Sequence, residues 1–311
     1  MTNLPTHIIT GFLGAGKTTF MLQLLEKKPA EENWAIVINE FGRIAIDSAT
    51  LKTMGQKHTP IYEIAGGCIC CSSRDDLGTQ LKQIVQESTF DRILIEPSGL
   101  GGVDEVETLV NGQDRLKLMP SVCLVDMTTI GNYRLQINPL YKRQIHFSDK
   151  IVFSKTDLLD QDEIADQLAI FQTNFPDKTA HLNANKQLSL DDLMNLNSKK
   201  SDSQSNKPGL FFPLNGHQPS TYHERSFSVP ANQKVKLKRL IETIQNDESI
   251  IRAKGVLNTD SGWQLLNYTL SDYQLKPDSA QKNSELVVIF ETNDLHHASA
   301  TKFEKIMSQT E

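Results

Sequence analysis

The chain has 311 residues, 38% of them hydrophobic and 23% charged, and its formal net charge is −6 at pH 7. The length favours about two domains, and the ordinary apolar fraction excludes bulk disorder because it allows a sizeable core. Charges of both signs with a net acidic balance, and no apolar stretch near the roughly 20 residues of a membrane span, predict neither a nucleic-acid partner nor a membrane contact.

The cysteines and the N-terminus together predict a cytoplasmic protein. Four cysteines, three of them within four positions, do not suit a disulfide framework. Thiols that stay reduced are typical of the cytosol. The first predicted strand follows the N-terminus almost at once, which leaves no room for a cleavable signal sequence.

The first predicted strand covers residues 6–10 and leads into a glycine-rich segment, residues 11–19. This segment fits the P-loop pattern G-x-x-x-x-G-K-S/T, and a helix is predicted over residues 18–27. Inward-facing N–H groups and the positive end of that helix would hold a nucleoside triphosphate, with Lys17 on the β/γ-phosphates and Thr18 on Mg²⁺. The predicted nucleotide-binding residues of this segment are Gly11, Gly14, Ala15, Gly16, Lys17, Thr18 and Thr19.

The second predicted strand, residues 34–39, is followed by a segment that ends at Asp47. It lies between two phosphate-site elements, which is where a switch that senses the γ-phosphate is expected. We predict that Asp47 supports the Mg²⁺ shell or positions a water molecule. The alternative is a solvated acidic loop residue.

A cysteine cluster, G-G-C-I-C-C, follows the predicted switch at residues 66–71. Thiolates are soft ligands that suit Zn²⁺, and a tetrahedral site needs a fourth ligand. We predict that Cys68, Cys70 and Cys71 bind the metal together with Glu40. The alternatives are a buried loop with incidental thiols and a redox pair, whereas Cys123 is expected to pack as a small hydrophobe.

Three further strands are predicted at residues 92–96, 120–126 and 149–154, with helices at 75–86 and 161–175. Glu96 ends the first of these strands and would hold the Mg²⁺ shell or orient water, while the Gly99 N–H would meet the γ-phosphate. The last strand ends in Ser154-Lys155-Thr156-Asp157, which has the x-K-x-D form of a guanine-reading loop. Asp157 can accept hydrogen bonds from guanine N1–H and the 2-amino group, and the stem of Lys155 can lie over the base.

Alternating strands and helices predict an α/β P-loop domain at residues 1–194, with a mainly parallel sheet flanked by helices. Residues 195–221 are polar and are expected to form a linker. Residues 222–311 predict a smaller α+β domain. Its strands are expected at 223–229, 251–258, 263–270 and 286–291, and its helices at 234–245 and 295–308.

The order of these motifs resembles that of the CobW-type P-loop GTPases, and more distantly that of the nickel-insertion GTPases of urease and hydrogenase maturation. The C-x-C-C motif is the most specific mark, and Arg252–Gly255 with Trp263 resembles the smaller C-terminal domain of the family. The resemblance implies GTP and GDP as ligands, hydrolysis carried by Lys17, Thr18, Glu96 and Asp47, and a metallochaperone role. Zinc is the favoured ion, with Co²⁺ and Ni²⁺ as alternatives, and a client metalloprotein is the partner.

Two features of the chain depart from the family pattern. Ser154 stands where such guanine loops usually have Asn, and the second domain lacks a histidine-rich tract. Two other functions fit the sequence: a zinc buffer or sensor with a regulatory nucleotide pocket, and a P-loop kinase or ATPase with structural cysteines. The sequence leaves the oligomeric state open.

Overall fold

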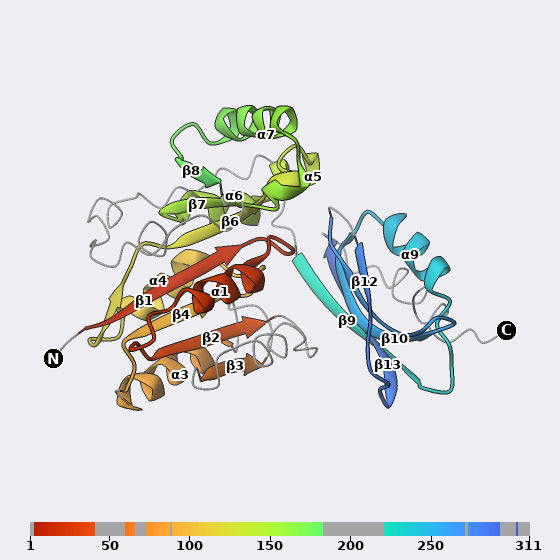
Figure 1. Ribbon diagram of the computed structural model, residues 1–311, viewed down its shortest axis with the longest axis horizontal. Helices are drawn as coiled ribbons and strands as arrows, with labels where there is room; N and C mark the ends of the chain where they lie inside the picture. The colour runs from red at the N-terminus through yellow and green to blue at the C-terminus, as the bar shows by residue number, and fades with distance from the viewer. Residues whose placement is uncertain are drawn as a thin grey trace. The chain divides into compact units, whose positions relative to one another are not determined.

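The computed structural model describes residues 3–40, 60–65, 73–87, 89–182, 221–270, 273–292 and 303. The chain divides into two compact units, Met1–Leu210 and Phe211–Glu311 (Figure 1). Asp47 and the cysteine cluster lie outside the described residues. So do residues 195–220 of the predicted linker and, apart from Phe303, the predicted helix at 295–308.

The first unit alternates strands and helices. Its strands are β1 (Leu4–Gly11), β2 (Trp34–Glu40), β3 (Ile61–Ala65), β4 (Arg92–Glu96), β5 (Leu116–Leu118), β6 (Val122–Asp126), β7 (Lys150–Ser154) and β8 (Ala180–Leu182). Its helices are α1 (Lys17–Glu26), α3 (Ser73–Glu87), α4 (Val103–Asn111), α5 (Tyr133–Ile137), α6 (Pro139–Phe147) and α7 (Gln161–Asn174), with short 3₁₀ turns η1 (Met127–Thr129) and η2 (Thr156–Leu158).

The described strands of this unit form one sheet in the order β3-β2-β4-β1-β6-β7-β8, and β5 pairs with the start of β1. Each pairing in this sheet is parallel. The predicted parallel α/β fold is therefore confirmed. The short strands β3, β5 and β8 and the helices α4, α5 and α6 are additions that the sequence patterns do not predict.

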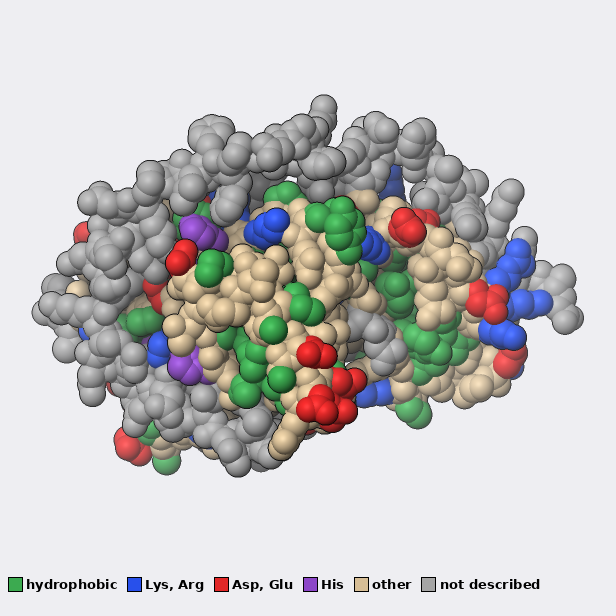
Figure 2. All heavy atoms as spheres, turned by 90° about the horizontal axis from the view of Figure 1, so that it is seen from above, with side chains coloured by type: hydrophobic (Ala, Val, Ile, Leu, Met, Phe, Trp, Pro, Cys, Tyr) green, Lys and Arg blue, Asp and Glu red, His purple; other side chains and the backbone are tan. Residues whose placement is uncertain are grey.

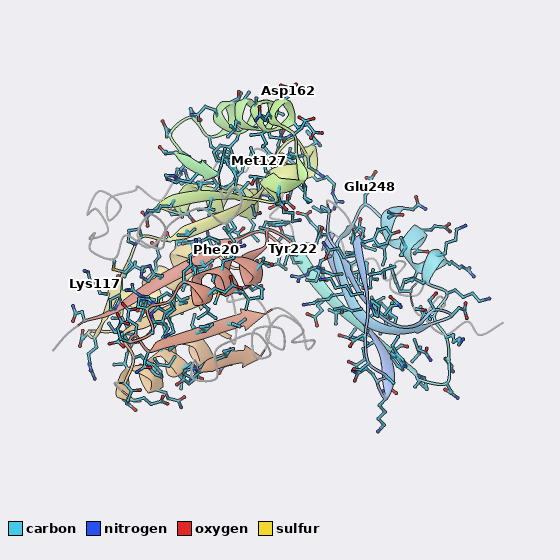
Figure 3. All side chains as sticks on the ribbon, viewed as in Figure 1. Phe20, Lys117, Met127, Asp162, Tyr222 and Glu248 are labelled. Atoms are coloured by element: carbon cyan, nitrogen blue, oxygen red, sulfur yellow. The ribbon has the colours of Figure 1, made fainter. Side chains whose placement is uncertain are left out.

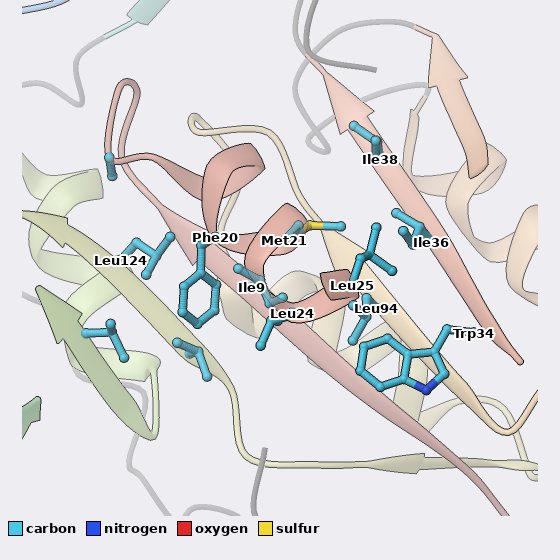
Figure 4. Close-up of a cluster of buried hydrophobic side chains, with 13 residues drawn as sticks. Ile9, Phe20, Met21, Leu24, Leu25, Trp34, Ile36, Ile38, Leu94 and Leu124 are labelled. Atoms are coloured by element: carbon cyan, nitrogen blue, oxygen red, sulfur yellow. The ribbon is translucent and has the colours of Figure 1, made fainter. Parts of the chain in front are cut away.

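Both faces of the sheet are buried, as the strands without polar alternation predict. On one face, Phe20, Met21 and Leu24 of α1 pack against strand residues such as Ile9 and Leu124 (Figure 4). On the other face, α3 and α4 pack against β1, β2 and β4 through Leu77, Leu81, Ile84, Val103, Val106 and Val110. Helices on both sides hold the strand ends in fixed positions.

The parallel arrangement brings four functional segments to one edge of the sheet. β1 ends at Gly11, β4 at Glu96, β6 at Asp126 and β7 at Ser154, so the loops that follow them leave from the same carboxyl edge. β5, which carries Lys117, pairs with the first residues of β1 at the opposite edge (Figure 3). In open α/β sheets ligands bind outside the carboxyl ends of the strands.

The second unit has a five-stranded antiparallel sheet in the order β12-β11-β10-β13-β9. Its elements are β9 (Thr221–Pro230), α9 (Leu237–Gln245), β10 (Ile250–Thr259), β11 (Gly262–Tyr268), β12 (Tyr273–Pro277) and β13 (Asn283–Thr292). Leu240 and Ile244 of α9 pack on one face of this sheet, which confirms a small α+β unit. A methyl group at Gly255 would lie 2.3 Å from the Glu285 carbonyl oxygen, so the strands approach too closely there for a side chain.

On the face drawn in Figure 2, several of the described acidic side chains gather in one group and several basic ones in another, and hydrophobic side chains are also visible. Among the helices of the described ranges, none has the length and apolar character needed to cross a membrane.

Candidate functional site

The segment after β1 is a tight glycine-rich loop. Gly11, Gly14 and Gly16 have φ angles of 142°, 80° and 84°, and residues other than glycine adopt such positive angles only at an energetic cost. A methyl group at Gly11 would also lie 2.4 Å from the Leu124 carbonyl oxygen on β6. The glycines therefore set both the turn of the loop and its close approach to the neighbouring strand.

Lys17 lies at the first position of α1, and its side chain bends back over the loop. Its Nζ donates hydrogen bonds to the carbonyl oxygens of Gly11 at 3.0 Å and Phe12 at 3.3 Å. The residue is only 7% exposed. An ammonium group held at the N-terminal end of a helix, above a turn of backbone amides, forms an anion-binding arrangement.

Thr18 and Glu96 come from different motifs and meet at the edge of the sheet. Thr18 Oγ1 donates to Glu96 Oε1 at 3.4 Å, and Glu96 is buried at the end of β4. A hydroxyl and a carboxylate are oxygen ligands of the kind that Mg²⁺ takes, so this donor set fits the ion. The third residue predicted for this ion, Asp47, lies outside the described residues.

The turn after β4 packs directly on the glycine-rich loop. A methyl group at Gly99 would lie 2.7 Å from Leu13 Cδ2 and 3.1 Å from Lys17 Nζ, so a side chain there would displace these two groups. Within the turn, the Leu100 N–H donates to Ser98 Oγ at 3.2 Å and the Gly101 N–H donates to the Ser98 carbonyl at 2.7 Å. The structure thus places Gly99 beside Lys17, as the prediction for a shared phosphate site requires.

Ser154 joins the end of β7 to two neighbouring elements. Its hydroxyl donates at 2.7 Å to the carbonyl oxygen of Ala15 in the glycine-rich loop, and it lies 3.3 Å from the carbonyl oxygen of Val125 on β6. Gly16 lies beside this contact, and its φ of 84° rather than a lack of space favours glycine there, since a methyl group would lie at an ordinary contact distance of 3.8 Å from Ser154 Cβ. The hydroxyl of Ser154 therefore ties the β7 loop to the phosphate loop.

The loop after Ser154 presents a cation and a carboxylate. Lys155 has φ 57° and ψ 27°, in the left-handed region that non-glycine residues rarely adopt. Its Nζ contacts Asp126 Oδ2 at 2.5 Å, which fixes the direction of the lysine stem. Asp157 follows within η2 and is exposed, so its carboxylate can meet an incoming base.

Asp126 is a site residue that the sequence patterns do not single out. It ends β6, is 7% exposed and accepts hydrogen bonds from the N–H of Thr128 at 3.1 Å and from its hydroxyl at 2.6 Å. An aspartate is a preferred residue at the N-terminal cap of a helical turn. This preference is the one local pattern in the sequence that points to Asp126. Its contact with Lys155 joins residues 29 positions apart, which no local pattern shows.

The predicted metal ligands fall largely outside the described residues. Cys68, Cys70 and Cys71 lie in the undescribed range 66–72, and Glu40 is described only by its backbone at the end of β2. That backbone pairs with Ala65, so Glu40 lies next to the strand residue three positions before Cys68. Within the described ranges, no group of three or more His, Cys, Asp or Glu side chains is arranged to hold a metal.

Cys123 behaves as a packed hydrophobic residue, as predicted. It is 1% exposed in β6, and burial raises the pKa of its thiol to about 12. A thiol that stays protonated is a poor metal ligand.

Comparisons with known proteins place the chain in a family. Residues 5–183 match the model described as "CobW/HypB/UreG, nucleotide-binding domain", and residues 225–306 match "Cobalamin synthesis protein cobW C-terminal domain". The chain is 36% identical over 155 residues to "Zinc chaperone YeiR" of Escherichia coli, covering 49% of this chain and 46% of that protein. It is 25% identical over 296 residues to "Zinc-regulated GTPase metalloprotein activator 1" of Dictyostelium discoideum, covering 81% and 62%.

Among solved structures, the zinc-bound YjiA GTPase from E. coli aligns over 98% of this chain and 99% of its own, with a TM-score of 0.45 and 18% identity. The chain spans about half of the length of the curated relatives it matches: 46%, 62% and 52% of three of them. The two family models together cover nearly all of the described residues of both units. The chain belongs to the CobW/HypB/UreG family, with a nucleotide-binding domain followed by a CobW C-terminal domain.

Proposed function

We propose that the chain is a GTP-hydrolysing metallochaperone that binds a transition metal, with zinc favoured over Co²⁺ and Ni²⁺, and transfers it to a client metalloprotein. The observation that carries the proposal is the phosphate loop with Lys17 held over it and the Thr18–Glu96 contact beside it. Family membership and relatives named as zinc chaperones and as a zinc-regulated GTPase support the role. The proposed compartment is the cytoplasm, where thiols stay reduced.

The nucleotide half of the proposal rests on positioning. Backbone amides of the glycine-rich loop and the ammonium of Lys17 would hold the phosphate chain, and the N–H of Gly99, which lies beside Lys17, would meet the γ-phosphate. Asp157 would accept from the guanine N1–H and 2-amino group, which adenine does not offer. The Asp126–Lys155 contact keeps the lysine stem in place for stacking on the base.

Mg²⁺ would be held by the Thr18 hydroxyl, supported by the Glu96 carboxylate and by Asp47. When bound, it neutralises charge on the phosphate oxygens, which is the main chemical contribution in phosphoryl transfer. Glu96 is buried beside Thr18 and is suited to orient a water molecule toward the γ-phosphate. These residues position groups and stabilise charge, so hydrolysis by the chain alone is expected to be slow.

The metal half of the proposal rests on sequence and register. Three thiolates of C-x-C-C and one carboxylate supply four ligands, which suits tetrahedral Zn²⁺. Glu40 pairs through its backbone with Ala65, and Cys68 follows Ala65 by three residues. Three residues span at most about 11 Å, a separation that allows the first thiol and the Glu40 carboxylate to share one ion.

The two halves would be coupled through the chain between β2 and the cysteines. The β2 strand ends at Glu40, and the predicted switch that senses the γ-phosphate begins there. GTP binding that orders this segment would bring the thiolates together, and hydrolysis would release the metal. A protein without such coupling would be the zinc buffer or sensor.

The first experiment compares nucleotide binding and hydrolysis by the wild-type chain, Lys17→Ala and Lys82→Ala. Lys82 is exposed on α3 and serves as a control for the loss of one positive charge. Losing a charged hydrogen bond costs about 1.5–3 kcal/mol, so Lys17→Ala should weaken GDP and GTP binding about 10- to 150-fold. Lys82→Ala should match the wild type within about twofold. ATP bound as tightly as GTP, or hydrolysis that survives in Lys17→Ala, would refute the GTPase assignment.

A further inference from the structure

Gln144 on α6 is a fully buried amide that contacts the turn after β4. It is 0% exposed, and its Nε2 donates at 3.0 Å to the carbonyl oxygen of Gly99 and at 3.0 Å to that of Gly101. Both partners are acceptors, so only the nitrogen end of the amide can face them. The orientation of the side chain is therefore fixed by its contacts.

These two bonds hold the turn that carries Gly99. Inside the turn, the Ser98 carbonyl oxygen accepts from the Gly101 N–H, and the Ser98 hydroxyl accepts from the Leu100 N–H. Gln144 donates to the two remaining carbonyl oxygens, those of Gly99 and Gly101. Gly99 in turn lies close against Leu13 and Lys17 of the phosphate loop, where a methyl group would come within 3.1 Å of the Leu13 nitrogen and of Lys17 Nζ. A shift of the turn would therefore move the Gly99 peptide relative to the Lys17 ammonium.

The helix that carries Gln144 is itself anchored on both sides. Tyr141 packs its ring edge-on against Phe12 of the phosphate loop, with ring centroids 6.1 Å apart. Arg143 contacts Asp104 at 2.5 Å and Glu105 at 3.6 Å, both in the first turn of α4, which follows the turn directly. α6 thus spans the phosphate loop and the start of α4, and Gln144 lies between these two anchors.

We propose that Gln144 is a positioning residue that fixes the turn carrying the Gly99 N–H for the γ-phosphate and so sets the preference for GTP over GDP. The inference rests on the proposed function, because it assigns Gln144 to the same nucleotide site. GDP is held by the phosphate loop and does not need the Gly99 turn. GTP needs both, so loss of the two Gln144 bonds weakens GTP binding selectively.

A purely structural role makes a different prediction. A buried amide that only supports the fold would, when replaced, lower stability and weaken both nucleotides alike or neither. The ratio of the two affinities separates these roles, because stability of the whole unit enters both affinities equally. Ser148 offers a matched control: it is 0% exposed, and its hydroxyl donates at 2.7 Å to the Gln144 carbonyl oxygen at the end of the same helix.

The test uses the full chain and measures the Kd of GDP and of the β,γ-imido analogue of GTP, with Mg²⁺, and the kcat for GTP. The variants are Gln144→Met, which keeps the volume and removes the donors, Gln144→Asn, which shortens the reach, and Ser148→Ala. Hydrogen bonds of this kind are worth about 1 kcal/mol each, so Gln144→Met should lose about 5- to 30-fold in affinity for the GTP analogue. GDP affinity should change less than about twofold, and Ser148→Ala should keep the wild-type ratio.

An unchanged ratio of the two affinities in Gln144→Met overturns the inference, even if both fall. If Gln144→Met does not fold, the ratio of the two affinities in Gln144→Asn decides instead. If neither variant folds, the amide serves the stability of the fold, and the inference is overturned as well. A wild-type chain that binds neither nucleotide would instead refute the proposed function, and the inference would fall with it.

Discussion

Ser154 shows how one side chain can replace a longer one in the nucleotide site. Guanine loops of the x-K-x-D form usually begin with Asn, which has a longer side chain than Ser154. The structure shows the serine hydroxyl within 2.7 Å of the Ala15 carbonyl and 3.3 Å of the Val125 carbonyl. The shorter residue therefore still links the base-reading loop to the phosphate loop.

Replacing Ser154 by Ala should weaken GDP and GTP to the same extent. The hydroxyl supports Ala15, which belongs to the loop for the phosphates that both nucleotides share. Loss of a neutral hydrogen bond of about 1 kcal/mol corresponds to about fivefold in Kd. Isothermal titration calorimetry with each nucleotide measures this change in Kd. Ser228→Ala, at an exposed serine in β9, is the control. Unchanged affinities in Ser154→Ala would show that the bond does not support the site.

The sequence predicts some residues of the site and misses others for a physical reason. Lys17 and Thr18 lie within one contiguous motif, and the structure places both at the carboxyl edge of the sheet. Gln144 contacts Gly99 across 45 positions, and Asp126 contacts Lys155 across 29. Such contacts depend on how helices and strands pack, so local spacing carries no signal for them.

At the level of elements, β1 and β4 are joined by a buried polar contact as well as by their backbone pairing. His7 Nε2 lies 2.7 Å from Arg92 Nη1, and both residues are buried. Arg92 can only donate, so His7 accepts through Nε2 and carries its proton on Nδ1. The Arg92 guanidinium also lies over the Trp34 ring, 5.5 Å from its centroid, which holds the start of β2 against β4.

This contact predicts that the first unit loses stability as pH falls below about 6.5. Burial lowers the pKa of His7 to about 3, and the charges of Arg92 and Lys150 act in the same direction. An unfolded histidine takes up a proton below pH 6.5, whereas folded His7 stays neutral, so acid stabilises the unfolded chain. Between pH 7.5 and pH 5.5, His7 should remove about 1.4 kcal/mol from the free energy of unfolding.

Urea unfolding at the two pH values measures this effect through Trp34 fluorescence in a Trp263→Phe background. His7→Gln keeps an acceptor for Arg92 and removes the titration, so its loss of stability should be smaller by about 1.4 kcal/mol. His181→Gln, at an exposed histidine in β8, should keep the wild-type pH dependence. Equal pH dependence in His7→Gln and the wild type would contradict this account.

The sequence predicts well those elements that carry a clear local signal, such as an unbroken apolar run or a helix cap. The strand predicted at 92–96 coincides with β4, and α7 begins at the predicted residue 161, where Asp160 and Glu163 form a capping box. α4 and α6 follow short loops and have brief apolar patterns, and β12 pairs only at the edge of its sheet. Tertiary packing decides such elements, so their local patterns are weak.

At the scale of the whole molecule, each of the two units has a hydrophobic core of its own. The phosphate loop, the Gly99 turn and the base-reading loop all belong to the first unit, as do the cysteines by sequence. We propose that the second unit recognises the client. The domain boundaries at residues 194 and 222 stay a prediction, because residues 183–220 lie outside the described residues.

The central claim is that nucleotide state and metal affinity are coupled in one chain. Coupling between two sites is reciprocal and is typically about 1–3 kcal/mol, or 5- to 150-fold in affinity. If GTP tightens metal binding, the metal must tighten GTP binding by the same factor. A buffer or sensor with two independent sites would show no such factor.

The most direct test is a titration of Zn²⁺ into the reduced full chain against a chromophoric chelator, first with GDP and then with the β,γ-imido analogue of GTP and Mg²⁺. We expect zinc to bind about 5- to 150-fold more tightly in the presence of the analogue, and Cys70→Ser to abolish the difference. Equal zinc affinity with both nucleotides, or full affinity in Cys70→Ser, would contradict nucleotide-gated metal delivery.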